Sequence, residues 1–389
     1  MPHSRHLPDA PAPISLGAHP RILVVKLATL GDLLLATPAL RALRLRYPLA
    51  RLDVLTTEAS ACLVRESPLV DHTFTLDKYA FDAPSDILRQ PSRLLRILPV
   101  LAALRRNNYH AVLLLHHLTL AFGRLKYRAL LAAINPRCSA GLDNGHGGFL
   151  DLRVPDLGFG DRHEAEYALA VAAAVGAPLP RSERGVRIAD LGWSAAGVRR
   201  RGSPPLVALH PGSGGYSVAR RWPAERFAEV AAALHGDTGA HVVLVGGADE
   251  RALHTHILDT LGQPDWATSE AGQQTPRELA ERLGQCALFI GNDSFPMHLA
   301  AAVGTPVVAI FGPSNARAWG PYAPNTPERT VVIRRDDLPC SPCFYRGHAL
   351  GTPEGCPPRP CLTELGAQPV LRAAHHLLQE RAAAASSGG

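Results

Sequence analysis

Short apolar runs alternate along the chain with segments of helical periodicity, and several of these runs are followed by loops rich in glycine or polar residues. In the first half, residues 21–26 (RILVVK) are predicted to form a buried strand, residues 33–43 a helix, and residues 52–56 the next strand. Strand, helix and strand in this order predict a parallel sheet with crossover helices. The same alternation returns over residues 206–311, which predicts a second α/β unit.

The length of the chain, 389 residues, favours two domains at about 150 residues per domain. We expect an N-terminal Rossmann-like domain over residues 21–185 and a C-terminal one over residues 186–381, both doubly wound and facing a central cleft. A segment rich in proline, glycine and arginine at residues 178–202 is the predicted linker. Residues 1–20 and 382–389 are predicted to be disordered tails.

The net charge of the chain excludes few classes of binding partner. The chain has 40 Lys and Arg against 34 Asp and Glu, a formal net charge of +6 that comes almost entirely from arginine. This balance is compatible with an anionic small ligand, an anionic membrane or a nucleic acid. The positive charge is spread along the chain and no nucleic-acid motif is recognised, so we expect no nucleic-acid partner. No run reaches the roughly 18–20 apolar residues of a membrane-spanning helix and no secretory signal is evident, which predicts a cytoplasmic protein.

Asp32 follows the first predicted strand, at the end of the strand where ligands bind in open α/β sheets. A carboxylate there can act as a general base if it reaches a substrate hydroxyl, or it can cap a helix. The sequence leaves two starts open for this helix: one near Asp32, and one at Pro38 with Thr37 as the N-cap.

Two loops in the second half are suited to binding a phosphate group. Residues 210–215 (HPGSGG) follow a predicted strand and expose backbone N–H groups, to which Arg220 or Arg221 can add a charged contact. Residues 291–298 (GNDSFPMH) join a strand to a helix whose N-terminus presents unpaired N–H groups. A plain connecting loop is the alternative for the first segment, and helix capping by Asp293 or Ser294 is the alternative for the second.

Residues 246–250 (GGADE) put Glu250 near a strand end, where an acid can bind a ribose hydroxyl. Neither half has a G-x-G-x-x-G sequence after its first strand, which argues against a nicotinamide cofactor. The loop at residues 210–215 also lacks the G-x-x-x-x-G-K-[ST] pattern of a P-loop.

Four of the seven cysteines cluster as Cys340-x2-Cys343-x12-Cys356-x4-Cys361. Two such pairs can hold a zinc ion tetrahedrally, while the surrounding prolines suggest a structural clip. In a large cytoplasmic chain the cluster is interpreted as metal-binding or reduced before it is interpreted as disulfides. We expect no catalytic metal.

Taken together, these segments resemble glycosyltransferase family 9, the ADP-heptose:lipopolysaccharide heptosyltransferases. The resemblance extends from Arg21 to near Leu371 and is carried by RILVVKLATLGDLLLATPALRALRLRYP, HPGSGGYSVARRWPAERF, GNDSFPMHLAAAVGTPVVAIFGPSNARAWGP and CSPCFYRG…CPPRPCL. It implies a GT-B fold that receives the acceptor in the N-terminal domain and the sugar nucleotide in the C-terminal domain. It also implies an inverting transfer of heptose from ADP-heptose that requires no metal cofactor.

The resemblance maps the catalytic base onto Asp32 and a cationic diphosphate contact onto Arg220. The donor-binding positions that it implies are Ser213, Gly214, Gly215, Glu250, Asp293, Ser294, Phe295 and His298. In the implied mechanism Asp32 takes the acceptor proton, and Arg220 with the N–H groups of residues 293–296 stabilises the leaving diphosphate. The acceptor is a lipopolysaccharide core or a related glycoconjugate, and the basic helix over residues 92–107 is a hypothetical peripheral contact with the anionic inner membrane.

Two positions depart from the family pattern. Phe295 stands where glycine is typical, and Arg220 stands where lysine is usual, so both bear on which sugar is bound more than on the reaction class. The alternatives are a transferase for another sugar nucleotide or acceptor, a GT-B-fold sugar-nucleotide epimerase, and a zinc-dependent interaction module. Sugar-nucleotide conversion without an acceptor would reveal the epimerase.

Overall fold

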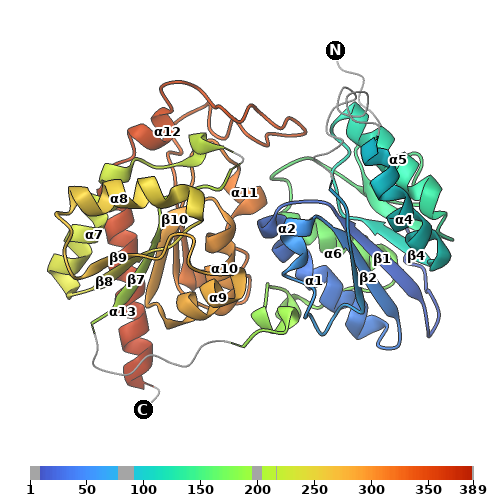
Figure 1. Ribbon diagram of the computed structural model, residues 1–389, viewed down its shortest axis with the longest axis horizontal. Coiled ribbons are helices and arrows are strands. Elements are labelled where there is room, and N and C mark those ends of the chain that lie inside the picture. Colours follow the sequence, from blue (N-terminus) through green and yellow to red (C-terminus); the bar gives the residue numbers. More distant parts are fainter. Residues whose placement is uncertain (1–8, 78–91, 195–203, 216, 388–389) are drawn as a thin grey trace. The chain divides into compact units, whose positions relative to one another are not determined.

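The chain divides into two compact α/β units, Met1–Gly192 and Trp193–Gly389 (Figure 1). The computed structural model describes residues 9–77, 92–194, 204–215 and 217–387. Residues 1–8, 195–202 and 388–389, which belong to the predicted tails and linker, lie outside the described residues. Within the described part of the chain, no helix is long and apolar enough to cross a membrane.

The first unit is built on a six-stranded sheet in the order β3-β2-β1-β4-β5-β6, in which every neighbouring pair is parallel. Its strands are β1 (Arg21–Lys26), β2 (Arg51–Thr56), β3 (His72–Thr75), β4 (Ala111–Leu114), β5 (Ser139–Asp143) and β6 (Leu152–Pro155). Its helices are α1 (Leu30–Arg46), α2 (Glu58–Ala61), α4 (Ser92–Arg106), α5 (Ala121–Ile134) and α6 (Glu164–Ala174). The central strands β1 and β4 are apolar and buried because helices cover both faces, with α1 packed on α6 and α4 packed on α5.

Helix α1 begins at Leu30, with Thr29 as its N-cap, so the start near Asp32 is the correct one of the two alternatives. The Asp32 carboxylate accepts the Thr29 backbone N–H at 3.4 Å as part of a capping box, and it also accepts the Thr29 hydroxyl at 2.8 Å. Pro38 lies inside the helix and cannot donate to the carbonyl of Leu34. The hydroxyl of Thr37 donates to that carbonyl instead, at 2.8 Å, which explains how the helix continues through the proline.

The predicted tails differ from the structure where residues are described. The Ile14 N–H donates to the Ala174 carbonyl at 3.1 Å, and the Leu16 N–H donates to the buried Tyr47 hydroxyl at 3.3 Å. These bonds attach part of the predicted N-terminal tail to the first unit. At the other end, helix α13 (Ala367–Ser387) runs through most of the predicted tail, because its alanines favour helix.

The second unit repeats the architecture with a parallel sheet in the order β12-β11-β10-β7-β8-β9. Its strands are β7 (Leu206–His210), β8 (His241–Leu244), β9 (Ala267–Ser269), β10 (Leu288–Asn292), β11 (Val307–Ile310) and β12 (Thr330–Ile333). Its longer helices are α7 (Ala224–Thr238), α8 (Arg251–Thr260), α9 (Pro276–Gln285), α10 (Phe295–Val303) and α13, with shorter α11 (Ala316–Trp319) and α12 (Pro360–Thr363). On one face, Trp222 and Phe227 pack edge to face in a core shared with α13.

Both sheets have the strand order of a Rossmann fold, as the alternating sequence pattern predicts. The order reverses between β1 and β4 in the first unit, and between β7 and β10 in the second. Ligands bind beyond the carboxyl ends of the strands at such a reversal. Asp32 in the first turn of α1, residues 210–215 at the end of β7, and residues 293–298 at the start of α10 follow these strands, so the fold brings each candidate segment to such an edge.

Candidate active site

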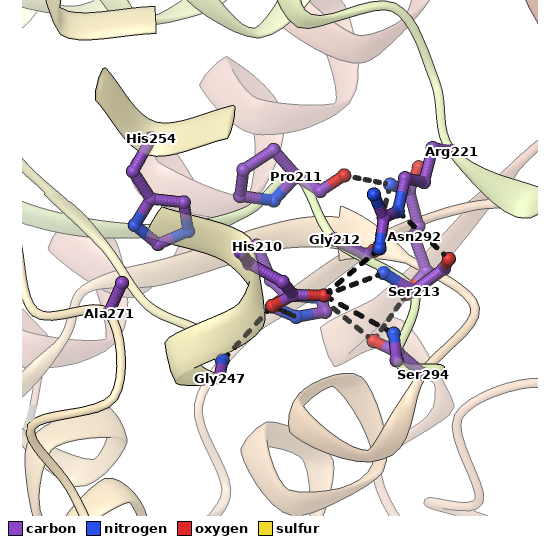
Figure 2. A network of polar contacts seen from close by, with 12 residues as sticks. His210, Pro211, Gly212, Ser213, Arg221, Gly247, His254, Ala271, Asn292 and Ser294 are labelled. Atoms are coloured by element: carbon purple, nitrogen blue, oxygen red, sulfur yellow. Dashed lines mark hydrogen bonds and ion pairs between the residues drawn. The ribbon is translucent and has the colours of Figure 1, made fainter. Parts of the chain in front are cut away.

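The loops after β7 and β10 form one structure, because these strands are neighbours and buried Asn292 ties the loops together. The Asn292 amide donates to the carbonyls of Pro211 and Gly212 at 2.8 and 3.0 Å. Its oxygen accepts the backbone N–H of Trp222 at 3.1 Å. The amide thus pairs buried carbonyls that would otherwise lack partners, and it sets the spacing of the two loops (Figure 2).

Arg220 connects the same two loops through its charged side chain, which is mostly buried. It ends the short turn η4 (Val218–Arg220), and its Nη2 donates to the Ser213 carbonyl at 2.7 Å. Its Nη1 lies 3.3 Å from a carboxylate oxygen of Asp293. The guanidinium is therefore fixed close to the residues that open α10.

In the glycine-rich loop, the side chain of Ser213 is buried and hydrogen-bonded, whereas the two glycines that follow it are exposed. The Ser213 hydroxyl donates to the Ser217 carbonyl at 2.7 Å and accepts from Arg221 Nε at 3.2 Å. Gly214 and Gly215 are exposed, and Gly214 has a φ of +66°, a conformation that favours glycine. Of the three predicted positions, the two glycines are exposed and the serine side chain serves the loop itself, so a ligand contact at the glycines stays a prediction.

Glu250 has a buried carboxylate that is surrounded by donors. One oxygen accepts the N–H groups of Ser213 and Gly214 at 3.1 and 3.3 Å, and the other accepts the N–H of Gly247 at 3.1 Å. His210 Nε2 lies 3.1 Å from that second oxygen. Burial alone would raise the pKa of Glu250, but the hydrogen bond and charge of His210, with the backbone N–H groups, hold it at about 2.

Two glycines make room for this carboxylate. A Cβ on Gly212 would lie 1.7 Å from a Glu250 oxygen, and a Cβ on Gly246 would lie 2.3 Å from the other. Any side chain at either position would displace the carboxylate. Glu250 therefore holds the loop backbone together, and its contact with a ribose stays a prediction.

Ser294 is the N-cap of α10, and its hydroxyl donates to the Asn292 carbonyl at 3.0 Å and lies 2.9 Å from His210 Nδ1. Phe295 is the half-buried first residue of the helix, and His298 is buried one turn further on. Pro296 has no N–H, so the N–H groups expected at residues 293–296 are those of residues 293–295.

Asp32, in the first unit, is half-buried, and its carboxylate is an acceptor in the capping box of α1. The loop around it is tied to the end of β4: the Leu27 N–H donates to His116 Nε2 at 2.8 Å, and Lys26 Nζ donates to the Leu115 carbonyl at 3.0 Å. The capping interpretation is therefore realised, and the general-base role remains a prediction.

An acid–histidine cluster at the same edge of the first unit was not predicted from the sequence. Buried His117 lies 2.9 Å from Asp156 through Nδ1 and 2.9 Å from Glu164 through Nε2. Burial alone would lower the pKa of His117, but the two carboxylates raise it to about 9. The only sequence signal was that this histidine interrupts an apolar run, which is too common to identify a partner.

The four clustered cysteines are free thiols. Across the described residues, no group of three or more His, Cys, Asp or Glu side chains could hold a metal ion. Burial and the neighbouring thiols raise the pKa of Cys343, and they raise that of Cys361 to about 11. The segment is anchored by buried Phe344 and by the N–H groups of residues 343 and 344, which both donate to the Pro313 carbonyl.

Comparisons with known proteins extend this description. The sequence model of glycosyltransferase family 9 (heptosyltransferase) matches residues 98–352. Lipopolysaccharide heptosyltransferase 3 of Escherichia coli is 27% identical over 311 residues, covering 76% of this chain and 84% of that protein. The structure of E. coli ADP-heptose lps heptosyltransferase II covers 93% of this chain and 99% of its own, with a TM-score of 0.64 and 22% identity. The iron-containing dodecameric glycosyltransferase TibC from enterotoxigenic E. coli H10407 covers 94% of this chain and 80% of its own, with a TM-score of 0.56 and 16% identity.

The two Rossmann-type units and these structural neighbours define a GT-B glycosyltransferase fold. The family model covers more than half of the chain, and the chain belongs to glycosyltransferase family 9, the heptosyltransferases. The resemblance carried by the sequence motifs is thereby confirmed, together with the α/β GT-B fold and the assignment as a transferase. The family assignment favours a transferase over the epimerase and the interaction module.

Proposed function

We propose that this protein transfers heptose from ADP-heptose to a hydroxyl of a lipopolysaccharide core or related glycoconjugate, with inversion and without a metal. The observation that carries the proposal is the joined pair of loops after β7 and β10, with Arg220 fixed beside the start of α10. A guanidinium and free backbone N–H groups suit the diphosphate of a nucleotide sugar. The names of the E. coli relatives support heptose, ADP-heptose and lipopolysaccharide as the substrate classes.

In the proposed reaction, Asp32 takes the proton of the acceptor hydroxyl as its oxygen attacks the anomeric carbon. The bond from that carbon to the diphosphate breaks, and ADP leaves with the electron pair. Attack from the face opposite the diphosphate inverts the anomeric configuration, through an oxocarbenium-like state of the kind that glycosidases use. The reaction requires Asp32 of the first unit to meet a donor held by the second.

The leaving diphosphate needs stabilisation as its charge grows. We assign this to Arg220, to the exposed backbone of Gly215, and to the N–H groups of residues 293–295. A fixed donor of this kind is typically worth ~3–4 kcal/mol in the transition state. Asp293 and Glu250 hold the donor loops, while Phe295 and His298 border the donor on α10.

We also propose that the first unit, which receives the acceptor, contacts an anionic membrane surface. Helices α4 and α5 and the loop before α5 expose leucines beside basic residues, which suits a surface that meets lipid headgroups. The exposed fractions are 54% for Leu98, 60% for Leu120 and 60% for Leu125. Binding to anionic vesicles that weakens with salt supports this contact, and binding that ignores salt or charge contradicts it.

A transfer assay tests the proposed function. The full chain is incubated with ADP-heptose and a heptose-deficient core acceptor, with and without a chelator, and the product linkage is determined by NMR. We expect an inverted linkage at equal rates in both conditions. Transfer from another nucleotide sugar only, loss of activity with the chelator, or conversion of the donor without an acceptor would each contradict part of the proposal.

A further inference from the structure

A histidine at the end of β4 holds the turn that leads from β1 into α1. His116 Nε2 accepts the Leu27 N–H at 2.8 Å. A backbone N–H can only donate, so Nε2 must carry a lone pair, and the ring is neutral with its hydrogen on Nδ1. We propose that His116 is a positioning residue, which fixes this turn and thereby holds the Asp32 carboxylate where it takes the acceptor proton. The inference rests on the general-base role that the proposed function gives to Asp32.

The position of the Asp32 carboxylate depends on the turn. The carboxylate accepts both the N–H and the hydroxyl of Thr29, at 3.4 and 2.8 Å. Thr29 directly follows a turn of three residues, in which the Ala28 N–H donates to the Lys26 carbonyl at 3.1 Å. A displacement within this turn therefore moves Thr29, and with it the oxygen that takes the proton.

The turn is held at its carbonyls and at one N–H by different side chains. Buried hydroxyls from the end of β2 and the start of α2 donate to the carbonyls of Lys26 and Ala28 at 2.8–3.1 Å; they belong to Thr56, Thr57 and Ser60. The N–H of buried Leu27 takes no part in the hydrogen bond of the turn itself, and it donates to His116. Removal of the imidazole would leave this N–H without its acceptor while the carbonyl contacts stay in place.

The direction of the His116 ring is fixed by its surroundings. The ring stacks on Tyr127 of α5, with 4.8 Å between the centroids and 24° between the planes. The main chain just before it is bonded to β1, because the Leu115 N–H donates to the Val25 carbonyl at 3.0 Å. The adjacent His117 belongs to the acid–histidine cluster instead. His116 therefore meets the turn with a defined nitrogen in a defined place.

A similar bond at the other end of the same two strands provides a matched control. His110 precedes β4, and its Nδ1 accepts the N–H of Arg21, the first residue of β1, at 3.1 Å. Because β1 and β4 are parallel, this bond lies at the amino edge of the sheet, away from Asp32. Loss of the imidazole at His110 removes the same kind of contact without changing the turn before α1.

Nitrogen NMR of the ¹⁵N-labelled full chain tests the bond and needs no substrate. We expect a scalar coupling between the Leu27 amide nitrogen and His116 Nε2, and a neutral ring whose unprotonated nitrogen is Nε2. His116→Phe removes the ring signals and so assigns them. A protonated Nε2 would overturn the inference.

Steady-state kinetics test the effect on the reaction. His116→Phe keeps a ring against Tyr127 but has no acceptor, so it should lower kcat by about 10²-fold with little change in KM, as for a displaced catalytic group. His116→Gln should recover most of this loss, because its amide oxygen can take the place of Nε2. His116→Asn, which is one carbon shorter, should not. His110→Phe should leave kcat unchanged.

A double-mutant cycle tests whether His116 acts through Asp32. In the Asp32→Asn background, His116→Phe should lower kcat no further. Equal losses in both backgrounds would overturn the inference, as would wild-type turnover in His116→Phe or an equal loss in His110→Phe. If His116→Phe does not fold, His116→Gln and His116→Asn make the same comparison.

The outcomes separate this inference from the proposed function. Absence of wild-type transfer from ADP-heptose, or near-normal turnover in Asp32→Asn, would count against the proposed function. Wild-type transfer that depends on Asp32 but not on His116 would reject the inference alone. Thermal unfolding of each variant checks that the fold is intact.

Discussion

The two units have the same order of strands in their sheets, but different polar side chains lie at the ends of their central strands. In the first unit, His117 lies between two carboxylates, Asp156 and Glu164, so both ring nitrogens are paired with acids of the same unit. In the second, His210 lies between one carboxylate and the hydroxyl of Ser294, which belongs to a helix N-cap. The same scaffold thus holds a closed charge cluster in one unit and a chain ending in a hydroxyl in the other.

The loops differ in the same sense. The loop after β1 is tight and holds Asp32 in a capping box, whereas the loop after β7 is rich in glycine and is accompanied by Arg220. A carboxylate suits proton removal, while backbone N–H groups and a guanidinium suit an anion. This contrast underlies the proposed division between the acceptor in the first unit and the donor in the second.

The largest expected effect separates the base from the donor loops. Asp32→Asn should lower kcat by about 10²–10⁴, because asparagine keeps the cap but cannot take a proton. Affinity for ADP and thermal stability should be unchanged, as checked by calorimetry and thermal unfolding. Asp161→Asn, an exposed site in the same unit, is the control. Near-normal turnover would remove Asp32 from this role.

The next effect belongs to the second unit. Arg220→Ala should lower kcat/KM by about 10²–10³ and weaken ADP binding, because a fixed cation beside the diphosphate is lost. Arg220→Lys should recover part of the loss, since lysine keeps the charge but not the fork of donors. Steady-state kinetics and calorimetry measure both variants. An unchanged ADP affinity in Arg220→Ala would contradict the donor assignment.

The acid–histidine cluster of the first unit should affect the free energy of unfolding rather than the rate of catalysis. The pKa of His117 is raised from its ordinary value to about 9, so folding favours the protonated ring. The resulting stabilisation, about 3 kcal/mol, should be complete below the unfolded pKa near 6.5 and lost as the pH rises through 9. Denaturant unfolding between pH 6 and pH 10 measures it. If His117→Gln retained the same fall in stability, the cluster would not be its cause.

The smallest expected effect concerns the choice of sugar. Phe295 opens α10 with a half-buried ring, at the position where the sequence resemblance leads us to expect glycine. Phe295→Gly should change the preference for ADP-heptose over a smaller ADP-hexose by about tenfold, as expected when one apolar contact is altered. Competition between the two donors measures the ratio. An unchanged ratio would show that the ring does not contact the sugar.

Much of the fold could be predicted because its signals are local. Apolar runs such as residues 21–26 and 306–311 mark strands, and Gly304 ends α10 with the φ of +83° that favours glycine. The weaker elements were missed: β9 and β12 are short and only partly buried, and α8 and α9 have mainly polar sequences. Their positions depend on packing against elements already formed.

The candidate loops were also predictable, because glycine and polar residues after a strand indicate a ligand edge. The partners inside the site were not. Glu250 meets Ser213 and His210 across nearly forty residues of sequence, and His117 meets Glu164 across a comparable distance. The hydrophobic periodicity of the sequence does not indicate such contacts. A buried histidine therefore resembles any core residue until the fold supplies its neighbours.

The proposed function depends most on the second unit being an ADP site that works through Arg220 and backbone N–H groups. Thermal unfolding of the full chain with ADP, UDP, GDP or CDP, each with and without EDTA, tests this directly. We predict that ADP alone stabilises the protein, equally in both buffers, and that Arg220→Ala loses most of the effect. Preference for another nucleotide, or stabilisation that EDTA abolishes, would contradict the account.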